Sequence, residues 1–170
     1  MNTSPYILAA PEPEDLDFLF RLENDPAEWP LSDGHMPYSR YALRQYLLDC
    51  KNDFYADRQL RLMVRTADRQ QTVAIVDLFN FSPYDNRAEV GIAVDPSLRT
   101  KGVGTASMAL LCDYASRTLG LRMLAAYVPA DNEASLRMLV NCGFSEVAIL
   151  PEWAKMGEKW ADLRILQKFL

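Results

Sequence analysis

The chain has 170 residues, of which 49% are of hydrophobic type, and a formal net charge of −5. This length predicts a single domain over residues 1–170 with enough apolar side chains to build a core, and the acidic balance argues against nucleic acid as the main partner. No run of about 18 apolar residues occurs, so we expect no membrane span. The first ten residues lack a basic segment followed by a long apolar one, so we expect no signal peptide.

Hydrophobic spacing predicts a mixed chain of strands and helices. Apolar runs, most of them rich in β-branched residues, predict strands at residues 6–9, 60–64, 72–81, 87–94, 123–128, 144–150 and 160–169. Three-and-four spacing predicts helices at residues 14–24, 40–51, 103–119 and 132–142. The order β-α-α-β-β-β-α-β-α-β-β favours an α/β or α+β domain with a mixed central sheet.

Local signals refine three of these helices. Ser39 is an N-cap candidate for the second helix, in which we expect Tyr41, Leu43, Leu47 and Leu48 to face the core. Gly120 suits the position just after the third helix, and Gly143 the position just after the fourth.

The number and spacing of the cysteines indicate whether a metal site or a disulfide is expected. The three cysteines are far apart in the sequence and form no CxxC pair, and the chain has one histidine. A zinc site is therefore not expected, and we predict a reduced, cytoplasmic protein without a bound metal ion.

One segment, residues 94–106, carries most of the functional information. Pro96 follows the strand at residues 87–94, and the turn from Arg99 to Gly104 then leads directly into the long helix. Free backbone N–H groups converge at a helix N-terminus, where the helix dipole is positive. Glycines let the backbone approach a ligand closely, and Arg99 and Lys101 add positive charge. The turn therefore predicts a phosphate or pyrophosphate site, although two glycines before a helix also occur in plain turns.

Two common phosphate motifs are excluded. Lys101 precedes the glycines, whereas the P-loop requires lysine after them. A dinucleotide fingerprint requires a third glycine where Ser107 stands, and it belongs to the first strand of its unit.

The remaining pattern, Arg99-Thr100-Lys101-Gly102-Val103-Gly104, resembles the pyrophosphate loop of the GNAT N-acetyltransferases. A second resemblance lies at Asp131-Asn132-Glu133-Ala134-Ser135 followed by Asn141-Cys142-Gly143-Phe144, with one helix and one strand between the two motifs. The segment at residues 86–92 resembles the branch of spermidine and ribosomal-protein N-terminal acetyltransferases.

This resemblance implies the GNAT fold, with a sheet of about seven strands and about four helices, splayed open between its fourth and fifth strands. It implies acetyl-CoA as co-substrate, with no metal, and attack by a primary amine within a ternary complex. The residues implied to bind acetyl-CoA are Ile92, Ala93, Val94, Arg99, Thr100, Lys101, Gly102, Val103, Gly104, Thr105 and Asn132. Asn132 also fits a plain N-cap.

Acetyl transfer requires a neutral amine, and only about one alkyl amine molecule in 10³ is neutral at pH 7. A carboxylate base supplies the deprotonation. Glu89 is the first candidate because it lies on the strand beside the splay, and Asp77 on the neighbouring strand is the second. The alternative for Glu89 is an ion pair with Arg87 or another surface cation.

The chain departs from the family at the general acid. The usual tyrosine, four residues before the glycine of the second motif, is replaced by Leu139. Either the thiolate leaves without a donor, since a thiol has a pKa of about 8.5, or another residue such as Tyr127 or Ser135 donates the proton. The alternative function is a non-catalytic acyl-CoA-binding domain of the same fold.

The family's acceptor site lies near the loop between the first two helices. In this chain we expect Glu28, Trp29, Asp33 and Tyr38 to contact the acceptor, because acids and aromatics suit an ammonium group. The acceptor is predicted to be a polyamine, a protein N-terminus or another small amine. The resemblance also implies a homodimer or larger homo-oligomer.

Overall fold

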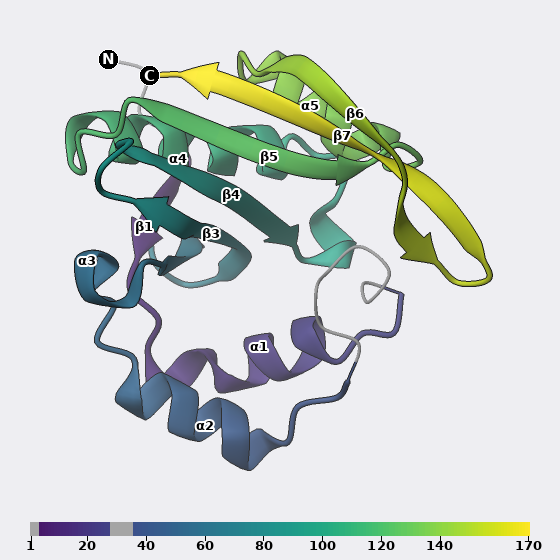
Figure 1. The fold of residues 1–170 in the computed structure, drawn as a ribbon. Helices are drawn as coiled ribbons and strands as arrows, with labels where there is room; N and C mark the ends of the chain where they lie inside the picture. The colour runs from purple at the N-terminus through teal and green to yellow at the C-terminus, as the bar shows by residue number, and fades with distance from the viewer. Residues whose placement is uncertain (1–3, 28–35) are drawn as a thin grey trace.

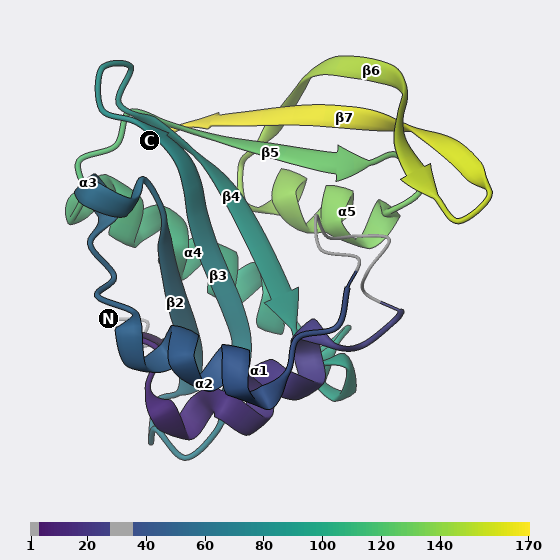
Figure 2. The same cartoon turned by 60° about the horizontal axis from the view of Figure 1, so that its bottom comes forward.

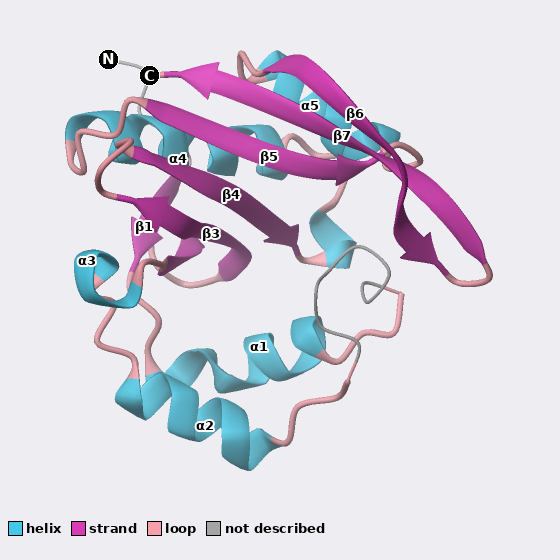
Figure 3. Ribbon diagram, in the orientation of Figure 1, coloured by secondary structure: helices cyan, strands magenta, loops and turns pink. Residues whose placement is uncertain are grey.

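The computed structural model describes residues 4–27 and 36–170. A twisted seven-stranded sheet runs through the molecule in the order β1-β2-β3-β4-β5-β7-β6. Helices α1 and α2 pack on one face of the sheet, and α4 and α5 on the other (Figures 1 and 2). The fold is therefore the mixed α/β architecture that the element order predicts, as the colouring by secondary structure shows (Figure 3).

The bounds of the elements follow the sequence patterns closely. The strands are β1 (Tyr6–Ala9), β2 (Leu60–Thr66), β3 (Thr72–Ser82), β4 (Arg87–Val94), β5 (Met123–Pro129), β6 (Ser145–Met156) and β7 (Lys159–Phe169). The helices are α1 (Leu16–Glu23), α2 (Arg40–Asp49), α3 (Phe54–Asp57), α4 (Val103–Arg117) and α5 (Glu133–Asn141), with short 3-10 turns η1 (Pro13–Asp15) and η3 (Pro96–Leu98).

The strand pairing confirms the predicted splay. All neighbouring strands are antiparallel except β4 and β5, which are parallel. Their pairing covers three residue pairs, from Arg87↔Met123 to Glu89↔Ala125. Beyond this point the two strands diverge, which Figure 2 shows as an opening between them.

The two faces of the sheet carry separate cores. The larger core lies between the sheet and α4, and it contains Leu78, Val90, Leu111 and Leu124. The smaller core joins α1 and α2 to Met63 and Ile75 of the sheet, with Leu19 fully buried at its centre. Alternation along β3 and β4 therefore places Asp77 and Glu89 on the α1/α2 face, because their neighbours in sequence belong to the larger core.

Three local expectations need correction. Leu43 and Leu47 of α2 are buried as expected, but Tyr41 and Leu48 are 78% and 58% exposed, because 3.6 residues per turn place them on a different side of the helix from Leu43 and Leu47. The four-residue helix α3, capped by Asp53, was not predicted. Strand β6 continues past Pro151 to Met156, because it pairs with β7 on both sides of a register shift.

The predicted caps of α2 and α5 are present. The Ser39 hydroxyl accepts a hydrogen bond from the Ala42 amide at 3.0 Å, and Gly143 adopts φ +87°. Bonds from Gly143 N to Val140 O at 2.9 Å and from Phe144 N to Leu139 O at 3.0 Å complete the closure of α5. Within the described ranges, no helix has the length and apolar character to cross a membrane.

Candidate functional site

The turn between β4 and α4 is held by Asp95. Its carboxylate accepts bonds from the amide and the hydroxyl of Ser97, at 2.9 and 2.7 Å, and thereby caps η3. The Ser97 hydroxyl bond is the main cause of a lowered pKa of the Asp95 carboxyl, and the Arg21 guanidinium, at 3.4 Å, adds a smaller contribution. The turn that follows is therefore anchored to β4 and to α1.

The backbone of this turn has the shape of an anion site. Thr100 and Gly102 both lie in the left-handed region, with φ +62° and +80°. A β-branched residue rarely adopts such a conformation, and strain of this kind is typical of functional sites. The first intrahelical bond runs from Ala106 N to Gly102 O at 3.0 Å, so the amides of residues 103–105 lie before it and can bind a ligand.

The basic side chains of the turn partly satisfy the backbone. Arg99 donates to the carbonyl of Val94 from Nε and Nη2 at 3.4 and 3.3 Å. Lys101 Nζ donates to Ser97 O at 3.1 Å. Both residues are exposed, so they place positive charge at the mouth of the opening between β4 and β5.

The end of β4 offers a backbone edge to a ligand. Residues 90–94 pair with β3 on one side, whereas on the other side the pairing with β5 ends at Glu89. Ile92, Ala93 and Val94 belong to this edge, and the glycine turn follows immediately. A linear ligand with amide groups can therefore add to β4 as a further strand and place an anionic end on the turn.

Helix α5 forms the other side of this entrance. Asn132 caps α5 by accepting a bond from Ser135 N at 3.2 Å, so the capping role is present. Gly104 faces α5: a Cβ placed there would lie 3.6 Å from Val94 Cγ2 and 3.7 Å from Met138 Cγ. The absence of this Cβ leaves space between the strand edge and α5.

Glu89 lies where β4 and β5 part. It pairs with Phe79 on β3 and with Ala125 on β5, and its side chain is half-buried. The expected alternative, an ion pair with Arg87, is absent, because the Arg87 guanidinium lies 3.5 Å from Asp85 instead. Among the described residues Glu89 has no hydrogen-bond or ion-pair partner. Its carboxylate is therefore available to accept a proton.

Asp77 is held in a charge network instead. Both of its carboxylate oxygens accept bonds from Arg61, at 2.8 and 3.0 Å, and Arg61 also donates to Glu23 of α1 at 2.7 Å. Burial lowers the pKa of the Arg61 guanidinium, but the two carboxylates more than offset this and hold it above its ordinary value. Asp77 is thus a fixed negative charge on the same sheet face as Glu89.

One of the candidate proton donors, Tyr127, and the family's usual donor position, Leu139, lie in different environments. Tyr127 of β5 is 45% exposed and lies two residues beyond the partner of Glu89, on the same face of the sheet. Leu139 of α5 is 3% exposed and belongs to the larger core. Tyr127 therefore lies on the β5 side of the opening, on the same face of the sheet as Glu89. Leu139 instead contributes an apolar contact to the core.

The acceptor loop is described only at its ends. Glu28, Trp29 and Asp33 lie outside the described residues. Tyr38 is 46% exposed, and its backbone N–H and C=O both bond to the side-chain amide of Asn24, at 2.7 and 2.9 Å. Sequence reasoning missed Asn24, because a single amide that joins backbone groups 14 residues away leaves no sequence pattern.

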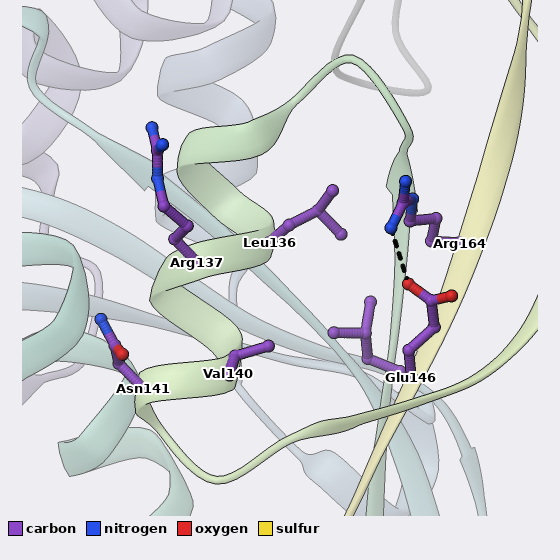
Figure 4. Close-up of a pocket in the computed structure, with 7 residues that line it drawn as sticks. Leu136, Arg137, Val140, Asn141, Glu146 and Arg164 are labelled. Atoms are coloured by element: carbon purple, nitrogen blue, oxygen red, sulfur yellow. Dashed lines mark hydrogen bonds and ion pairs between the residues drawn. The ribbon is translucent and has the colours of Figure 1, made fainter.

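A separate hollow of about 280 Å³ lies between α5 and the β6–β7 strands (Figure 4). Its polar side contains an ion pair between Arg164 and Glu146 at 2.9 Å. It is lined by Leu136, Arg137, Val140, Asn141, Glu146, Arg164 and Leu166, none of which was predicted as a site residue. Residues 4–27 and 36–170 contain no cluster of three or more potential metal ligands.

A sheet split at one parallel strand pair, with a glycine turn and a helix N-terminus at the mouth of the split, defines the class of this protein. A family profile described as an acetyltransferase (GNAT) domain matches residues 6–145. The chain therefore belongs to the GNAT acetyltransferase family.

Individual relatives agree with this assignment. The chain is 37% identical over 87 residues to YwnH of Bacillus subtilis, provisionally named a phosphinothricin acetyltransferase, which covers 51% of this chain and 53% of YwnH. It is 27% identical over 137 residues to the spermidine N(1)-acetyltransferase of Escherichia coli, covering 79% and 69%. The match thus spans about half the length of YwnH, as it also does for YoaA of the same bacterium.

The fold is also that of a solved structure. The spermidine N-acetyltransferase from Vibrio cholerae, in complex with CoA and spermine, superposes with a TM-score of 0.86. The match covers 98% of this chain and 96% of that protein at 21% identity. At this identity the similarity concerns the fold.

Proposed function

We propose that this protein is an acetyl-CoA-dependent N-acetyltransferase that acetylates a primary amine. The observation that carries the proposal is the unpaired edge of β4 beyond Glu89, which leads into the glycine turn at the N-terminus of α4. This arrangement offers an extended backbone edge and an anion site in one continuous path. Family membership supports the same activity.

The residues of this path suit acetyl-CoA. Residues 103–105 present free amides for the pyrophosphate, and Arg99 and Lys101 supply positive charge. Ile92, Ala93 and Val94 present the strand edge for the amide-bearing arm, and Asn132 lies at the start of α5 across the entrance. Acetyl-CoA would supply a thioester, whose carbonyl an N–H of the β4 edge can polarise.

Glu89 acts as the general base in this proposal. Its carboxylate lies at the point where the strands part and has no partner among the described residues. A base at this position can accept the ammonium proton, directly or through a water molecule, before the amine attacks. Asp77 is the weaker candidate because both of its oxygens are bound to Arg61.

The leaving thiolate has two routes. A thiol with a pKa of about 8.5 can leave without a proton donor, and the Tyr127 hydroxyl on the other wall of the split can donate one. Leu139 lies in the larger core and has no hydroxyl group, so the family's usual proton donor is missing at this position. This observation also favours the second candidate function, an acyl-CoA-binding domain without turnover.

The acceptor is proposed to be a cationic alkyl amine such as a polyamine. On the α1/α2 face of the sheet, Glu23 and Asp77 both bind the guanidinium of Arg61, whereas the Glu89 carboxylate has no partner among the described residues. The negative charge of Glu89 favours a positively charged acceptor. The named activities of the Escherichia coli and Vibrio cholerae proteins support the same substrate class.

A homo-oligomer is also part of the proposal. Ile149 and Trp153 on the edge strand β6 are 49% and 65% exposed, and an apolar edge strand favours association. A solved spermidine N-acetyltransferase from Vibrio cholerae with this fold is dodecameric. Sedimentation velocity tests this point, and a monomer at micromolar concentration would contradict it.

Calorimetric titration with acetyl-CoA tests the function. We expect micromolar binding by the wild type and loss of binding in Gly102→Val, because valine is disfavoured at φ +80° and its side chain would narrow the turn. A panel of amines then identifies the acceptor by mass spectrometry of the product. Binding with hydrolysis but no acetylated amine would favour the non-catalytic candidate, and absence of binding would refute both.

A further inference from the structure

A glycine interrupts the middle of β4 beside the proposed active site. Gly91 pairs with Asp77 of β3, two residues beyond Glu89. Its φ is not in the left-handed region, so the conformation of the backbone does not require glycine. Glycine inside a strand weakens it and often marks the close approach of another group.

The group that approaches Gly91 is the ring of Phe79. A Cβ at Gly91 would lie 3.3 Å from Phe79 Cε1, 3.7 Å from Asp77 Cβ and 3.9 Å from Asp77 Oδ2. The first of these distances is tighter than an ordinary contact. The missing side chain therefore lets the ring of Phe79 lean over β4 next to the Asp77 carboxylate.

Strand register puts this ring between two carboxylates. Phe79 pairs directly with Glu89, and Asp77 pairs directly with Gly91, so all four residues share one face of the sheet. Directly opposite residues have Cβ atoms about 4.5–5.5 Å apart. The Phe79, Asp77 and Glu89 side chains are half-buried, and this group lies where β4 separates from β5.

Among the described residues, no cationic side chain makes a cation–π contact with the ring of Phe79. Arg61 is committed to Asp77 and Glu23 and lies 5.9 Å from the ring of Tyr46. Across the described parts of the chain, Phe79 takes part in no aromatic pair or cation–π contact. An aromatic ring beside two carboxylates, one of them without a partner, has the composition of an alkylammonium site.

We propose that Phe79, positioned by Gly91, binds the alkylammonium group of the acceptor between Asp77 and Glu89 and thereby determines acceptor selectivity. This inference rests on the proposed function. The ring contributes cation–π attraction and an apolar surface for the first methylene groups. Asp77, fixed by Arg61, supplies charge, and Glu89 is left to accept the proton.

Direct binding of diaminobutane to the CoA-saturated protein tests the proposal without requiring turnover. Phe79→Leu keeps an apolar side chain and removes the π face, whereas Phe79→Tyr keeps the ring. Gly91→Ala leaves every charge in place and displaces the ring. Phe169→Leu is the matched control, because Phe169 is a 62% exposed phenylalanine whose ring lies 5.2 Å from the guanidinium of a surface cation, Arg122.

We expect Phe79→Leu to raise the Kd for diaminobutane by about 3- to 30-fold, the range of one cation–π contact. Gly91→Ala should raise it in the same direction, while Phe79→Tyr and the control stay within about twofold of the wild type. The Kd for CoA should not change in any variant, and the amine KM should rise more than kcat falls.

An unchanged amine Kd in Phe79→Leu, or a wild type that binds CoA but no diamine, would overturn the inference. Failure of the proposed function is a different result, namely no acetyl-CoA binding or no acetylated product with any amine. Urea unfolding of each variant identifies any loss of folded protein.

Discussion

The charge network of Arg61 yields a prediction that separates a structural role of Asp77 from a catalytic one. Arg61 makes two bonds to Asp77, at 2.8 and 3.0 Å, and one to Glu23 at 2.7 Å. A hydrogen bond to a charged group contributes about 1.5–3 kcal/mol. Because 26% of each side chain remains exposed, solvent screening weakens the attraction between Arg61 and Asp77. We therefore expect a coupling energy of about 2 kcal/mol between Arg61 and Asp77.

A double-mutant cycle with Arg61→Met and Asp77→Asn measures this energy by urea unfolding. Arg61→Met should cost more, about 3 kcal/mol, because it removes the ion pairs to both Asp77 and Glu23. The pair Arg117–Asp113 on α4 is the control, since its side chains are 80% and 58% exposed and its coupling should be about 0.3–0.5 kcal/mol. A coupling between Arg61 and Asp77 below about 0.5 kcal/mol would refute the reasoning.

Four further predictions concern the proposed site. Glu89→Gln should lower kcat by about 10²- to 10⁴-fold with an unchanged Kd for acetyl-CoA, and near-wild-type turnover at every pH would contradict this. Gly104→Ala should keep or raise stability by up to about 1 kcal/mol, because its Cβ meets only ordinary contacts; it should nevertheless weaken acetyl-CoA binding in calorimetry, and an unchanged Kd would show that the ligand does not approach there. Leu139→Tyr should cost about 1–3 kcal/mol by overpacking and raise turnover little, whereas a large gain would reveal a missing proton donor. Because the pKa of Asp95 is lowered in the folded protein, its carboxylate stabilises the fold above the unfolded-state pKa of about 3.9, and this stabilisation is lost as pH falls through the folded-state pKa. In urea unfolding, the stability advantage of the wild type over Asp95→Asn should therefore shrink below about pH 4. A constant difference down to pH 3 would contradict this prediction.

Local chemistry explains why so much of the fold could be predicted. The strands 6–9 and 87–94 are present with the predicted bounds, because alternation and turn residues act over a few neighbouring positions. Ser39 begins α2 and Gly143 ends α5 as expected, since capping depends on one side chain or one dihedral angle. The left-handed Gly102 at the start of α4 belongs to the same class of local signal.

Burial was less predictable where a pattern allowed two faces. Tyr41 and Leu48 lie on one side of α2, and Leu43 and Leu47 lie on another, and only the second pair is buried. Both sides carry apolar residues, so the pattern alone does not identify the buried one. The docking of α2 against α1 and the sheet decides which side is covered.

The sequence alone determined the order of elements and the glycine turn, because each depends on residues close together in the chain, and it predicts an anion site at that turn. Only the tertiary structure decided the partners of the carboxylates. Asp77 is bound by Arg61, 16 residues away, and Glu23 reaches the same guanidinium across 38 residues, whereas Glu89 remains available where the sheet opens. Strand register and the docking of α1 bring these groups together, and no short-range pattern encodes a register.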